Sequence, residues 1–104
     1  MRVIIAGSRT ITDYRTVEEA IERSGFHVTE VVSGAAHGVD QLGEVWAARH
    51  GVPVRRFPAD WERFGRAAGP RRNQAMVTHA TMAPEGGALI AVWDGLSRGT
   101  QNTI

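Results

Sequence analysis

The chain has 104 residues, of which 42% are hydrophobic and 22% are charged, and its formal net charge is +1. This length allows one domain with one core, so we treat residues 1–104 as a single domain. The near-neutral charge gives no overall reason to bind nucleic acid or an anionic membrane, and any anion site must depend on locally placed arginines. The absence of cysteine excludes disulfides, thiolate metal sites and a cysteine nucleophile.

The sequence shows no signal for a membrane or a metal. No segment approaches the ~18 consecutive apolar residues of a membrane span, and no long apolar run follows the first residues. We therefore expect no signal peptide, no membrane partner and a cytoplasmic protein. The four histidines lack the spacing of metal ligands, and we expect neither a metal site nor a cofactor.

The first half of the chain is predicted to form two strands, each followed by a helix. Residues 3–6 form a short β-branched run that ends at Gly7 and is typical of a buried parallel strand. Residues 14–24 have apolar side chains at helical spacing, and we expect Thr16 to cap this helix. Residues 29–32 and 38–50 repeat the pattern as a second strand and a second helix.

The second half of the chain continues the alternation. Residues 52–57 predict a third strand near an edge of the sheet, because the segment carries two adjacent arginines. Residues 58–69 predict a long polar loop with two aromatic residues. A helix follows at 70–80, with Pro70 in its first turn, and residues 88–93 predict the fourth strand.

The order of these elements defines the fold class. Alternating strands and helices predict a parallel sheet with helices on both faces, an α/β fold of the Rossmann-like, three-layer α/β/α type. After a turn at 94–99, the chain stops about one turn into a last helix, and we expect that helix to be truncated. A truncated helix would leave apolar surface uncovered beside Leu89 and Val92, so we expect self-association as a homo-oligomer.

Each predicted strand is followed by a cluster of small or polar residues. In a parallel sheet these clusters share one edge, where open α/β sheets bind ligands. Glycines let the backbone approach a ligand, and helix starts offer N–H groups to phosphate, although the cluster at 33–40 also suits a plain tight turn. The predicted ligand-binding residues are Gly7, Ser8, Arg9, Ser33, Gly34, Ala35, Gly38, Asp40, Asp60, Trp61, Arg72, Asn73, Asp94, Gly95, Ser97, Gly99 and Thr100.

Some of these side chains have specific roles in this hypothesis. Arg9 and Arg72 can each pair with phosphate through two parallel hydrogen bonds, although Arg9 also suits a surface ion pair with a nearby aspartate. Trp61 is a candidate for stacking on a base or for covering the core. Asp40 and Asp94 are candidates for accepting hydrogen bonds from ribose hydroxyls.

Five stretches, spread in order along nearly the whole chain, carry a family resemblance: MRVIIAGSR at 1–9, SGAAHGVD at 33–40, FPADW at 57–61, AGPRRN at 68–73 with Met76, and WDGLSRGT at 93–100. They resemble the YspA/YpsA-related branch of the SLOG superfamily, which also contains the Smf/DprA proteins and the lonely-guy enzymes. The resemblance implies a Rossmann-like domain that binds a nucleotide or nucleotide-derived phosphorylated ligand, in a branch common in bacteria and phages.

The resemblance also implies an enzymatic alternative. Lonely-guy enzymes cleave the N-glycosidic bond of nucleoside monophosphates with an arginine and a glutamate, the latter in a PGGxGTxxE signature. In this chain residues 99–100 match the GT, Thr103 stands at the glutamate position, and residues 94–97 replace PGG. A hydrolase built on this chain would need Asp40, Asp60 or Asp94 as its catalytic carboxylate.

We therefore weigh three functions. The leading hypothesis is a sensor or sequestering module that binds a small nucleotide-like ligand at the carboxyl edge of the sheet. The first alternative is a nucleotide phosphoribohydrolase. The second, by analogy with Smf/DprA, is a nucleic-acid-binding accessory protein, but the near-neutral charge and the lack of a long basic stripe argue against a nucleic-acid partner.

Overall fold

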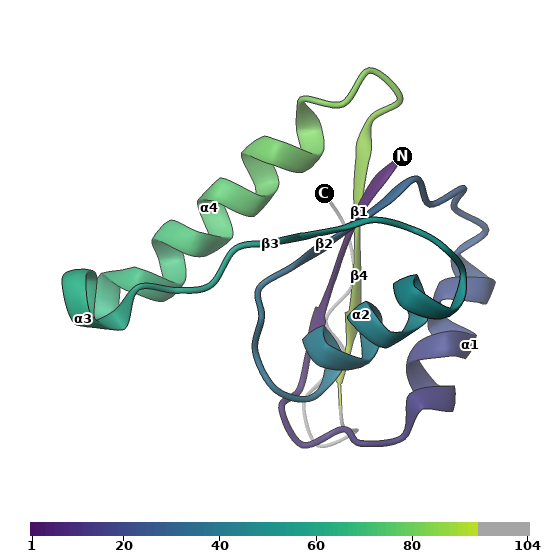
Figure 1. Ribbon diagram of the computed structural model, residues 1–104, viewed down its shortest axis with the longest axis horizontal. Coiled ribbons are helices and arrows are strands. Elements are labelled where there is room, and N and C mark those ends of the chain that lie inside the picture. Colours follow the sequence, from purple (N-terminus) through teal and green to yellow (C-terminus); the bar gives the residue numbers. More distant parts are fainter. Residues whose placement is uncertain (94–104) are drawn as a thin grey trace.

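A parallel sheet of four strands organises residues 1–93, the part of the chain that the computed structural model describes (Figure 1). All three strand pairings are parallel. The spatial order is β3-β2-β1-β4, so β1 is central and β3 is an edge strand, as its adjacent arginines predict. The strands are β1 (Arg2–Gly7), β2 (Glu30–Ser33), β3 (Val54–Arg56) and β4 (Gly87–Val92).

Helices cover both faces of this sheet. Figure 1 places α1 and α2 on one side and α4 on the other, with the short α3 at the outer end of α4. This is the predicted Rossmann-like arrangement in three layers. The helical segments are α1 (Tyr14–Ser24), α2 (Val39–Arg49), α3 (Trp61–Phe64), the 3-10 turn η1 (Gly65–Ala67) and α4 (Ala68–Thr81).

The alternation of side chains along β1 divides the core between the two faces. Val3 and Ile5 are fully buried in the apolar cluster beneath α1 and α2. Ile4, between them, points to the opposite face and joins a second cluster with Met76 and Ala80 of α4. The central strand therefore holds both helical layers to the sheet.

The structure differs from the sequence-based expectation in the cap of α1 and in the segment 58–69, although α1 has the predicted bounds. Asp13 caps α1, because its carboxylate accepts a hydrogen bond from the Arg15 N–H at 3.0 Å, and Thr16 lies inside the first turn. The segment 58–69, expected to be a loop, contains α3, η1 and the start of α4. Asp60 caps α3 by accepting from the Arg63 N–H at 3.1 Å.

The end of β4 bears on the expected self-association. Val92 is only 8% exposed and belongs to the core beneath α1 and α2, whereas Leu89 is half-buried beside α4. Self-association stays a prediction. The expected turn and last helix, including Asp94, lie outside the described residues. Within residues 1–93, no helix is long and apolar enough to cross a membrane.

Gly7 allows the closest approach between β1 and β4. A Cβ atom at Gly7 would lie 1.8 Å from the carbonyl oxygen of Val92. The Ser8 N–H donates a hydrogen bond to that same oxygen at 2.9 Å, so the oxygen cannot easily move away. The close packing of β1 against β4 at this point therefore requires a residue without a side chain.

We predict that Gly7→Ala lowers the free energy of unfolding by about 1–3 kcal/mol, the usual range for an added group in a packed site. Urea unfolding followed by circular dichroism measures the change. The control is Gly69→Ala in α4, where the new Cβ would lie 3.4 Å from the Trp61 ring in ordinary contact. Alanine is the better helix former, so this variant should equal or exceed the wild type. Equal stability of both variants would contradict the close approach.

Candidate functional site

The loops after β1, β2 and β3 meet at one edge of the sheet, as expected for parallel strands. They enclose a cavity of about 240 Å³, which we call the loop cavity, lined by Arg9, Gly34, Ala35, Ala36, His37, Pro58, Ala59, Trp61 and Arg72. A second cavity of about 300 Å³, the strand cavity, lies against β1 and β4 and is lined by Ala6, Gly7, Arg9, Ala36, Asp40, Arg72, Asn73, Met76, Leu89, Ala91 and Trp93.

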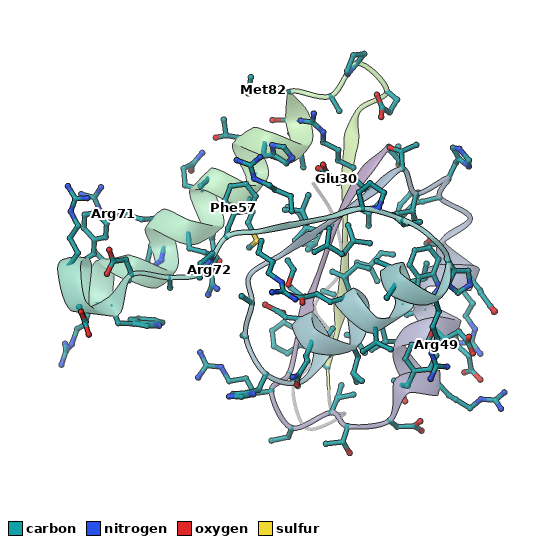
Figure 2. All side chains as sticks on the ribbon, viewed as in Figure 1. Glu30, Arg49, Phe57, Arg71, Arg72 and Met82 are labelled. Carbon is teal, nitrogen blue, oxygen red and sulfur yellow. The ribbon has the colours of Figure 1, made fainter. Side chains whose placement is uncertain are left out.

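Arg72 lines both cavities and is held in place by two hydrogen bonds. Its Nη1 donates to the carbonyl oxygen of Gly34 at 2.6 Å, and its Nε donates to Oδ1 of Asn73 at 2.8 Å. Figure 2 shows it near the α3 end of α4. A Cβ atom at Gly34 would lie 2.6 Å from Nη1 of Arg72 and 2.8 Å from Oδ2 of Asp40. Glycine at this position therefore lets both charged groups approach the loop.

Several N–H groups of the loop after β2 already donate hydrogen bonds to oxygen atoms of the protein. The Ala35 N–H donates to the Ser33 hydroxyl at 3.1 Å, and the Ala36 N–H donates to Oδ2 of Asp40 at 3.3 Å. The Val39 N–H, at the start of α2, donates to the carbonyl oxygen of Ser8 at 3.2 Å. These are donors that the glycine pattern assigned to phosphate. In the structure they bind oxygen atoms of the protein, and the guanidinium groups of Arg9 and Arg72 supply positive charge to the cavities.

Ser33 and Gly38 position this loop against α2 and against the residues that follow β1. Ser33 is fully buried, and its hydroxyl donates to Oε2 of Glu44 at 2.6 Å. Gly38 has a φ of +76°, and a Cβ there would lie 2.3 Å from the Ser8 carbonyl oxygen. Sequence reasoning missed Glu44, although it stands four residues after Asp40 on α2, a spacing that brings two helical side chains together.

Asp40 is the candidate carboxylate that lines the strand cavity. It is only 6% exposed. Burial raises the pKa of its carboxyl group, although the Ala36 N–H and the Arg72 guanidinium oppose this shift, and the Glu44 carboxylate adds to it. Asp60 instead uses its carboxylate to cap α3.

Arg9 and Trp61 are exposed side chains that line the loop cavity. Arg9 forms no ion pair within residues 1–93, and the carboxylate of Asp13 caps α1 instead of pairing with it. Trp61 is 53% exposed and so does not serve as a cover for the core. Trp93, which follows β4, forms a wall of the strand cavity.

Two points of the sequence analysis are left: metal binding and the predicted site residues near the end of the chain. Within the described part of the chain, no group of three or more histidine or carboxylate side chains could hold a metal ion. Five of the predicted ligand-binding residues lie beyond residue 93, outside the described part of the chain: Asp94, Gly95, Ser97, Gly99 and Thr100.

Comparison with known proteins identifies the family. The sequence model of the YspA, cpYpsA-related SLOG family matches residues 1–64, more than half of the chain. The chain belongs to this family. It is also 38% identical over 85 residues to the Gene 61 protein of Mycobacterium phage D29, a match that covers 73% of this chain and 67% of the phage protein. No solved structure matches the chain.

We predict that Asp40→Asn gains stability relative to the wild type as the pH rises from about 3 to about 7. The carboxyl group has a higher pKa in the folded than in the unfolded protein, so the wild type loses stability as the pH rises from the unfolded value, about 3.9, through the raised one. The variant lacks this loss. Urea unfolding of both proteins across this range measures it. A constant difference between them would show that folding leaves this carboxyl group unperturbed.

Proposed function

We propose that the chain binds a nucleotide or nucleotide-derived phosphorylated ligand at the carboxyl edge of the sheet, as a sensor or sequestering module. The observation that carries this proposal is the meeting of Arg9, Arg72 and Trp61 in one cavity. Guanidinium groups pair with phosphate oxygens in a planar fork, and an exposed indole ring offers a face to a base. Membership of the SLOG family supports a nucleotide-related function.

The volumes and shared walls of the cavities indicate how such a ligand would lie. The loop cavity is about 240 Å³, below the roughly 300–1,000 Å³ of typical ligand sites. It shares Arg9, Ala36 and Arg72 with the strand cavity. A phosphate between the two arginines therefore lets the rest of the nucleotide extend toward Trp61, toward Asp40, or toward both.

We predict that Arg9→Ala and Arg72→Ala each weaken nucleotide binding by about tenfold or more. A hydrogen bond to a charged group contributes about 1.5–3 kcal/mol, and about 1.4 kcal/mol corresponds to a tenfold change in affinity. Isothermal titration with AMP, GMP, CMP and UMP measures the dissociation constants. Arg9 is exposed, so its variant tests the site without disturbing the bond between α4 and the loop after β2.

The matched control for this experiment is Arg23→Ala. Arg23 is exposed in the last turn of α1 and lines none of the cavities at the carboxyl edge. This variant loses the same charge and should keep the wild-type affinity. If all three variants bind the tightest monophosphate as the wild type does, the phosphate does not lie between Arg9 and Arg72.

One observation favours a second candidate, the nucleotide phosphoribohydrolase: Asp40 and Arg72 line the same cavity. Cleavage of an N-glycosidic bond develops positive charge on the ribose, so a catalyst needs an ionised carboxylate near the anomeric carbon and an activated water. Asp40 meets these needs poorly, because its buried carboxylate accepts the Ala36 N–H and burial raises its pKa. It suits a hydrogen bond to a ribose hydroxyl better.

We therefore predict weak or absent hydrolysis of nucleoside monophosphates that bind. Chromatography of released free base provides the assay, with Asp40→Asn, Asp60→Asn and Asp94→Asn compared with the wild type. The Asp60 carboxylate caps α3, so the folding of the Asp60→Asn variant is checked by circular dichroism before the assay. Turnover in the ordinary enzyme range, roughly 1–10³ per second, that disappears in one variant would establish an enzyme and identify its catalytic carboxylate.

A further inference from the structure

A third cavity adjoins the loop cavity and is lined by arginines. It has a volume of about 300 Å³ and lies between β3, α3 and the first half of α4. We call it the arginine groove. It shares Pro58, Ala59 and Arg72 with the loop cavity. The side chains that define it are Arg55, Arg56, Phe57, Phe64, Arg71 and Arg72.

The groove lies where the charge of the chain is concentrated. Residues 55–72 contain six of the twelve arginines and two carboxylates, Asp60 and Glu62, which gives this segment a formal charge of +4 in a chain of +1. The near-neutral total therefore conceals a local basic surface. Asp60, the acidic residue among those that line the groove, has its carboxylate engaged at the start of α3.

Two of the arginines are already neutralised or held within the fold. The Arg56 guanidinium pairs with Oε1 of Glu44, with Nη2 at 2.6 Å and Nε at 2.9 Å. Arg72 donates to the carbonyl oxygen of Gly34 at 2.6 Å. The charge of Arg56 is therefore compensated by Glu44, whereas Arg72 is fixed in position and keeps its charge, which the proposed function assigns to the first phosphate.

Arg55 and Arg71 are different, because neither forms an ion pair with any residue from 1 to 93. Each guanidinium lies over an aromatic ring of the groove, Arg55 at 5.5 Å from the centre of Phe57 and Arg71 at 4.2 Å from the centre of Phe64. Stacking engages the faces of the guanidinium groups and leaves their N–H edges to hydrogen-bond an anion. Figure 2 shows Arg71 on the outer side of α4 and Arg72 on the side toward the sheet, both in the half of α4 nearer α3.

We propose that the arginine groove binds a second phosphate group of the same ligand, which makes the ligand a linear dinucleotide rather than a mononucleotide. The inference rests on the proposed function. One phosphate lies between Arg9 and Arg72 in the loop cavity, and the other meets Arg55 and Arg71. The nucleoside unit that joins them crosses the small residues Pro58 and Ala59, which both cavities share. The second contact adds affinity without a second association step.

The test compares each nucleoside 5′-monophosphate with its 5′-phosphorylated linear dinucleotide: AMP with pApA, GMP with pGpG, CMP with pCpC and UMP with pUpU. The dinucleotide of the preferred base should bind the wild type about tenfold or more tightly than its monophosphate. The affinity for the dinucleotide should also fall more steeply with salt concentration, because the arginines of the protein neutralise more phosphate charge in that complex. The double variant Arg55→Ala/Arg71→Ala should bind the dinucleotide only as tightly as the monophosphate and should leave monophosphate binding unchanged.

The control removes the same charge elsewhere. Arg15→Ala/Arg23→Ala changes two exposed arginines of α1, on the opposite face of the sheet from α4, and should retain the preference for the dinucleotide. Equal binding of dinucleotide and monophosphate by the wild type would overturn the inference and leave the proposed function standing. The inference would also fail if the groove variant weakened both ligands equally. Failure of every probe to bind would instead overturn the proposed function.

Discussion

The hydrogen bond from Arg72 to the carbonyl oxygen of Gly34 ties the helix on one face of the sheet to the loop that leads into the helix on the other face. A guanidinium can reach this carbonyl because Gly34 has no side chain, and the same gap admits the carboxylate of Asp40. Arg72 lines all three cavities at this edge. This contact therefore fixes where the Arg72 charge lies and links the loop to α4, which also packs on the sheet through Met76 and Ala80.

The sequence predicts the layers of this fold well because hydrophobic patterning decides them. The apolar run of β1 indicates a strand buried on both faces, and Val3 and Ile4 do lie in separate clusters. The adjacent arginines of β3 indicate an edge. Helix caps were less predictable, because Asp13 and Thr16 are both good N-cap residues and only the path of the chain selects between them. The short α3 could not be recognised in the sequence for a similar reason, since Asp60 and Trp61 also suit a polar loop.

The sequence predicts a candidate site at the carboxyl edge of the sheet, where the structure has cavities, but it does not predict the contacts that shape them. Glycine and small residues after each strand indicate where a ligand would lie. They do not show that Asp40 folds back to accept the Ala36 N–H, or that Ser33 is buried against Glu44, because both contacts depend on how α2 packs on the sheet. The family match has a similar limit. It ends at residue 64, the last residue of α3, so Arg71 and Arg72 of α4 belong to a part of the candidate site that it does not cover.

The internal hydrogen bonds of the loop after β2 also affect how a ligand would be received. A loop whose N–H groups depend on a ligand becomes ordered only on binding, and the lost conformational entropy weakens the complex. In this chain Ser33, Asp40 and Ser8 supply the acceptor oxygens, so the loop is ordered when the protein folds. A ligand that bound at this edge, as proposed, would therefore meet a preorganised loop, and its association would not have to wait for a loop to close.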